Sequence, residues 1–156
     1  MKQALAGALA GALLTVVAYT FVMSETKAEA AESPAPVRFD RNLIGGIGLT
    51  AVPPDPYQDI LVAGELNMEV ATLFQGEELR ASVFQSTPAK TDHRTRPNEN
   101  DEFVLVVSGK LILTEPNGKA HEFLPGDTLM LPRGYTGTWE MQGDYREVAV
   151  VMNKNR

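Results

Sequence analysis

The sequence predicts an all-β fold, a sandwich or barrel, for most of its 156 residues. Turn signals made of Gly, Pro, Asn and Asp recur roughly every 6 to 12 residues. No helical pattern of about ten or more residues follows the N-terminal apolar segment. Residues 79–86 alternate as a half-buried strand does, with Leu79 and Ala81 on one side and Arg80 and Ser82 on the other.

The chain begins with a segment of a different kind. Lys2 precedes an uncharged run over residues 4–23, and the small-residue site Ala28-Glu29-Ala30 follows. This order predicts a signal peptide over residues 1–30 and a periplasmic or secreted domain. Because about 20 apolar residues also span a bilayer, an uncleaved anchor holding the domain on the periplasmic side of the inner membrane is the alternative.

We expect residues 31–37 to be a linker and residues 38–156 to form a single domain. Residues 42–49 form either a glycine-rich strand or a loop. Residues 51–57 contain three prolines, which exclude a central strand. Two strands, 68–75 and 79–86, then flank a short turn.

The second half of the domain is a succession of short strands and turns. A break is expected at Ser108-Gly109, a type I′ hairpin turn at Asn117-Gly118, and another turn at Gly143-Asp144. The expected strands are 101–109, 110–115, 119–124, 128–132, 136–142 and 145–152.

Composition excludes several classes of function. The net charge of −6 disfavours nucleic-acid binding and docking on an anionic membrane, so only the N-terminal segment is expected to touch a membrane. The absence of cysteine excludes disulfides, zinc–thiolate sites and thiol nucleophiles. The glycines of residues 45–48 lack the strand-turn-helix context of a nucleotide fingerprint.

Two segments share a distinctive frame. Glu102 is followed by six residues and Gly109, and Gly126 is followed by five residues, Pro132 and then Gly134. Glycines permit tight turns and proline fixes a strand exit, so the frame predicts a meander closing on a small cavity.

This frame resembles the two motifs of the cupin superfamily. Over residues 95–152 the match is closest to the branch similar to the (S)-ureidoglycine aminohydrolase cupin domain. The resemblance implies a jelly-roll-like β-barrel of about nine to eleven short strands. It also implies a homodimer, since small cupins often dimerise through an N-terminal strand, and residues 43–49 are the candidate segment.

The chain departs from the cupin pattern at the metal ligands. Only Glu102 of the ligand set is retained. The histidine positions hold other residues: Thr95 and Pro97, or Arg96 and Asn98, and then Gly137. The branch also tends to carry a lysine near Arg146-Glu147, where this chain has none.

The two histidines of the chain do not replace the missing ligands in this interpretation. His93 is expected to be a solvated loop residue and His121 a polar residue at a strand end. We therefore predict no metal and no cofactor.

Glu102 is the candidate catalytic residue. In an apolar cavity its carboxyl must either pair with a base, Arg94, Arg96 or Arg133, or have a raised pKa suited to general acid–base chemistry. The candidate ligand-binding residues are Arg96, Asn98, Glu102, Tyr135 and Trp139. Tyr135 is expected at the rim of the barrel, and Trp139 either stacks on a ligand or fills the core.

The sequence thus favours an exported, metal-free cupin domain that binds a small polar ligand of the ureide, carboxylic acid or sugar type. The alternative is an enzyme similar to ureidoglycine aminohydrolase or to sugar-modifying cupins, with Glu102 as acid and base. A third interpretation is an interaction subunit whose pocket is vestigial.

Overall fold

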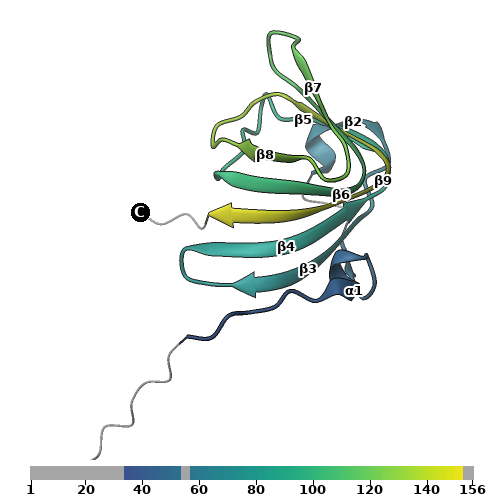
Figure 1. Ribbon diagram of the computed structural model, residues 1–156. Helices are drawn as coiled ribbons and strands as arrows, with labels where there is room; N and C mark the ends of the chain where they lie inside the picture. The colour runs from purple at the N-terminus through teal and green to yellow at the C-terminus, as the bar shows by residue number, and fades with distance from the viewer. Residues whose placement is uncertain (1–33, 54–56, 153–156) are drawn as a thin grey trace, which may run out of the picture. The chain divides into compact units, whose positions relative to one another are not determined.

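The computed structural model describes residues 34–53 and 57–152 (Figure 1). The predicted signal or anchor segment, residues 1–30, lies outside these residues, as does part of the linker. No helix in the two described stretches is long and apolar enough to cross a bilayer.

The all-β prediction is confirmed: the described residues form one sheet of nine strands, with a short helix and a 3-10 turn. The elements are α1 (Arg41–Ile44), β1 (Thr50–Val52), η1 (Gln58–Ile60), β2 (Leu61–Gly64), β3 (Met68–Gln75), β4 (Leu79–Ser86), β5 (Ala89–Asp92), β6 (Glu102–Thr114), β7 (Ala120–Phe123), β8 (Thr128–Leu131) and β9 (Thr138–Met152).

Two long antiparallel strands, β6 and β9, organise the sheet. They pair along almost their whole lengths. The C-terminal part of β9 also pairs with β4, and its N-terminal part with β5, while β6 pairs with β8 at one end and β7 at the other. Figure 1 shows β3, β4, β9, β6 and β8 side by side in one half of the sheet. The other half contains β2, β5 and β7 and shares β6 and β9 with the first.

The two halves meet at Gly109 and Gly143, both with a φ of 68°. The expected break at Ser108-Gly109 and the expected turn at Gly143-Asp144 are wrong, because β6 and β9 continue through these positions. The β6–β9 register shifts instead between Val106 and Lys110, as at β-bulges. A Cβ on Gly109 would lie 2.6 Å from the carbonyl oxygen of Gln142, so only glycine lets the two backbones approach this closely.

The other local expectations have mixed outcomes. Strands 68–75 and 79–86 are confirmed as β3 and β4. Residues 42–49 are neither strand nor simple loop: they begin within α1, whose N-cap Asp40 accepts from the amide of Asn42 at 2.8 Å. Strands β2 and β5 were not expected.

The hairpin between β6 and β7 is present, but its turn lies one residue earlier than expected. The amide of Gly118 donates to the carbonyl of Glu115 at 2.9 Å, so Pro116 and Asn117 are the central residues. Because proline fixes φ near −65°, Pro116 suits the second position of an ordinary turn and leaves the positive φ, 89°, to Gly118.

Candidate functional site

A cavity of about 460 Å³ lies on the inner face of the sheet. Both halves of the sheet contribute to it, together with the loop of residues 96–100. Its polar lining includes Arg80, His93, Asn98, Glu102 and Glu147, and Trp139 adds an aromatic side chain.

The strand register explains why two carboxyl groups face this cavity. Side chains directly opposite each other on paired strands share a face, and every second residue returns to it. On the inner face, three successive rows cross β6, β9 and β4: Glu102–Val151–Arg80, then Val104–Ala149–Ser82, then Val106–Glu147–Phe84. The short side chains of the middle row leave room between the outer two.

Glu147 is the most buried acid at the site, with 3% of its surface exposed. Its carboxylate accepts a hydrogen bond from the hydroxyl of Tyr145. Burial, reinforced by the nearby charge of Glu102, raises the pKa of Glu147 from 4.5 to about 8. At neutral pH this carboxyl is therefore mainly protonated.

Glu102 is partly buried and lies in the same row as Arg80, with Val151 between them. Burial raises its pKa from 4.5 to about 7, and the charge of Arg80 opposes this rise. The salt bridge considered from the sequence is not formed: Arg94 pairs with Asp92, and Arg96 pairs with Asp59 at 3.5 Å. Glu102 is thus a carboxyl that can give or take a proton near neutral pH.

His93 is not the solvated loop residue that the sequence suggested, because it lines the cavity. Its Nδ1 lies 3.2 Å from the carbonyl oxygen of Arg96, and its Nε2 lies 3.1 Å from the hydroxyl of Thr91. Since a carbonyl can only accept, Nδ1 carries the hydrogen. Burial lowers the pKa of His93, which favours the neutral ring.

Trp139 lies between the core and the cavity. It packs against the hydrophobic core and also lines the cavity, with its ring centroid 5.6 Å from that of His93. Its indole N–H is shielded and has no hydrogen-bond partner among the described residues. Trp139 therefore offers the cavity an aromatic surface rather than a donor.

Arg96 and Asn98 line the cavity, and contacts with the rest of the chain hold their loop in place. The side-chain amide of Asn98 donates to the carbonyl of Asn100 at 2.9 Å. Its backbone amide donates to the carbonyl of Tyr135, also at 2.9 Å. The guanidinium of Arg96 lies 4.9 Å from the ring centroid of Tyr57, which restricts its movement.

Tyr135 does not line this cavity, contrary to the expectation. Its backbone carbonyl accepts a hydrogen bond from the amide of Asn98, while its side-chain hydroxyl donates to the carbonyl of Thr114 at 3.1 Å. Burial raises the pKa of Tyr135 to about 12. The side chain borders a second pocket, where His121 lies 2.6 Å from the carboxylate of Glu115.

The residues present do not fit the metal ion that the cupin pattern implies. His93 and Glu102 line the cavity, but His121 borders the other pocket. Within the described residues, no three His, Cys, Asp or Glu side chains converge as metal ligands would.

Sequence reasoning missed three residues of the site: Arg80, His93 and Glu147. Glu147 directly precedes the apolar run Val148–Met152, and this position at the edge of a buried strand was a usable signal, because a fully buried acid is uncommon. The position of Arg80 was visible in the alternation of β4, but its neighbours in β9 and β6 could not be known without the register.

Comparison with known proteins gives one family match. Residues 74–148 match the family described as EutQ-like cupin domain. No curated protein gives a significant match. The finer resemblance to the ureidoglycine aminohydrolase branch stays a hypothesis.

Several solved structures share the fold. A protein of unknown function of the DUF861 family from Pseudomonas syringae pv. tomato DC3000 is 28% identical, with a TM-score of 0.58; the match covers 66% of this chain but only 43% of that one. The EutQ protein of Clostridium difficile is 13% identical, with a TM-score of 0.51 and coverages of 74% and 80%. The polyketide cyclase RemF of Streptomyces resistomycificus is 18% identical, with a TM-score of 0.51 and coverages of 77% and 81%. At these low identities the last two support the fold alone.

Proposed function

We propose that this chain carries a cupin domain, as the match of residues 74–148 supports, and that the domain binds a small polar molecule in its cavity without the help of a metal ion. The expected ligand classes are ureides, carboxylic acids and sugars. A partly enclosed cavity lined by apolar and aromatic surface, with a few polar groups converging on it, is the usual form of a small-molecule site.

One observation carries this proposal: two carboxyl groups, Glu102 and Glu147, face the same cavity at a cost in stability. Burial raises the pKa of both, which means that each disfavours the folded state when ionised. Two apolar side chains in place of Glu102 and Glu147 would fill the barrel without that cost. A polar ligand that hydrogen-bonds to the pair would compensate for it.

The alternative function is catalysis by Glu102. Its pKa of about 7 suits a residue that both donates and accepts a proton at neutral pH. Glu147 and the neutral ring of His93 would then orient the substrate, since both groups line the same cavity.

Export and dimerisation are part of the proposal. We keep the periplasmic or secreted location, with an inner-membrane anchor as its alternative, on the pattern of residues 1–30. We also keep the homodimer, although residues 43–49 form the end of α1 and a turn, so that any contact through this segment would not be an exchanged strand.

The protein expressed from residue 31 and purified without chelator tests the proposal. Bound metal is measured by elemental analysis, and ureides, carboxylic acids and sugars are screened by thermal shift. We expect substoichiometric metal and stabilisation by at least one ligand, which Glu102→Gln weakens. Stoichiometric metal would overturn the metal-free mode of binding, and the absence of any ligand response would favour the interaction subunit.

A further inference from the structure

We propose that the ligand of this cavity carries a positive charge, as an amine, an amidine or a guanidine does, and that it binds between Glu102 and Glu147. This inference rests on the proposed ligand-binding function and narrows it. An amino sugar or a guanidino compound would satisfy it, whereas a simple carboxylic acid would not.

The inner rows of the sheet bring two acids and one base to the cavity. Arg80 occupies the row of Glu102, and Glu147 lies two rows away. The neighbours of Glu147 across the strands are Phe84 and Val106, neither of which bears a charge. The carboxylate of Glu147 is therefore left with the hydroxyl of Tyr145 and with the like charge of Glu102.

The other bases near the cavity are engaged elsewhere. Arg96 pairs with Asp59 and lies over the ring of Tyr57. His93 holds its one hydrogen toward a backbone carbonyl. Ionisation of both acids thus leaves a negative charge that Arg80 alone does not balance.

In the ligand-free protein a proton compensates this charge, consistent with the raised pKa values of Glu102 and Glu147. A cation of suitable size can take the place of that proton. It would donate hydrogen bonds to both carboxylates. The aromatic side chains of Trp139 and Phe84, which also line the cavity, favour a cation over an anion. An anionic ligand cannot take the place of that proton.

Three planar probes of nearly equal size separate the effect of charge from that of shape: benzamidine is cationic, benzamide neutral and benzoate anionic. Each is titrated into the full-length chain at neutral pH, and binding is followed by NMR. The single tryptophan gives one indole N–H signal, from Trp139 in the cavity wall. We expect benzamidine to bind at least about tenfold more tightly than benzamide, and benzoate to bind most weakly, because hydrogen bonds to a buried charge exceed those of neutral groups by about that factor.

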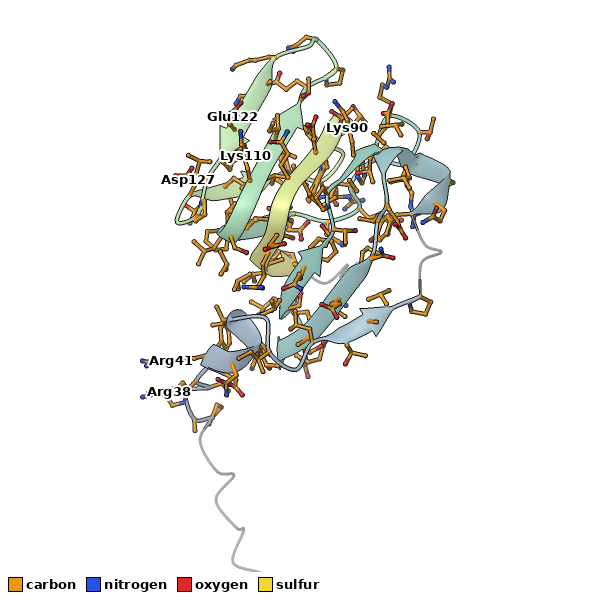
Figure 2. All side chains as sticks on the ribbon, turned by 90° about the vertical axis from the view of Figure 1, so that its right-hand side faces the viewer. Arg38, Arg41, Lys90, Lys110, Glu122 and Asp127 are labelled. Carbon is orange, nitrogen blue, oxygen red and sulfur yellow. The ribbon has the colours of Figure 1, made fainter. Side chains whose placement is uncertain are left out.

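Two variants locate the effect. Glu147→Gln keeps the size and the acceptor of the side chain, and we expect it to weaken benzamidine at least about fivefold while benzamide changes less than about twofold. Glu122→Gln removes one charge from the opposite side of β6 and β7, where Glu122 lies beside Lys110 (Figure 2), and should change neither.

The probe titrations can contradict a cationic ligand without contradicting small-molecule binding. Tighter binding of benzamide or benzoate than of benzamidine would overturn the inference that the ligand is cationic, and would leave the proposed small-molecule binding intact. An equal loss for all three probes in Glu147→Gln would make Glu147 structural and also overturn it. No binding of any probe would overturn it too, and would extend to the proposed function only if the thermal-shift screen also failed.

Discussion

Replacing Glu147 by Gln should stabilise the protein, and by more as the pH rises. Below about pH 4.5 the acid is protonated in both the folded and the unfolded chain, so its burial has little pH-dependent cost. Above that pH the unfolded chain releases the proton while the folded chain retains it, because burial and Glu102 hold the pKa of Glu147 at about 8. The free energy of unfolding therefore falls between the two pKa values.

The size of the effect follows from the same shift. The rise from 4.5 to about 8, at about 1.4 kcal/mol for each pH unit, sets a ceiling of about 5 kcal/mol. Relaxation around a buried charge lowers this, so we expect Glu147→Gln to gain about 3 kcal/mol at about pH 9 and less than about 1 kcal/mol at about pH 5. The hydroxyl of Tyr145 can still donate to the amide oxygen of Gln, which preserves the local hydrogen bond.

Urea denaturation followed by the fluorescence of Trp139, the only tryptophan, measures both quantities. Glu122→Gln is the matched control, since Glu122 is largely exposed beside Lys110. It should change the free energy of unfolding by less than about 0.5 kcal/mol at either pH. If Glu147→Gln gained the same amount at both values of pH, or lost stability at high pH, the charge of Glu147 would not be the cause and the reasoning would fail.

Three further outcomes are expected. Gly109→Ala should destabilise the fold by about 3 kcal/mol or more in thermal unfolding, because its Cβ would contact the backbone of β9. Gly118→Ala, which has open space around it, should lose only about 1 kcal/mol. Equal losses would contradict the close approach of β6 and β9 at Gly109. An NMR titration of His93 should give a pKa below 6.5, because burial disfavours the charged ring, and a value at or above 6.5 would contradict this effect of burial. Asn98→Ala should weaken ligand binding and cost about 1 kcal/mol of stability through the lost bond to Asn100, and an unchanged affinity would show that the order of this loop does not matter for the site.

The repeated turn signals and strand alternation were sufficient to predict the all-β fold, and the spacing from Glu102 to Gly134 was sufficient to predict a likeness to cupins, which the match of residues 74–148 to a cupin family model supports. Strand ends were harder to predict at glycines. A glycine with positive φ serves a turn or a bulge equally well, and only the partner strand decides, as Gly109 and Gly143 demonstrate.

The site was predicted only in part for the same reason. Glu102, Arg96 and Asn98 could be placed at the cavity from the sequence because they lie in or beside a motif. Glu147 and Arg80 are brought to the cavity by pairing between strands distant in sequence, which no local pattern encodes. His93 was misjudged because its polar sequence neighbours suggested exposure, whereas the loop folds back and buries the ring against Trp139.

The position of β9 has a consequence for how the chain acquires its structure. This strand comes after all the others in the sequence, yet β4, β5 and β6 all pair with it. A nascent chain that has emerged only as far as Gly137 lacks the strand that joins both halves of the sheet. Folding must therefore wait for the synthesis of Thr138–Met152, and the long sequence separations that it then closes make it slow. Until that moment β4, β5 and β6 lack the strand with which all three pair.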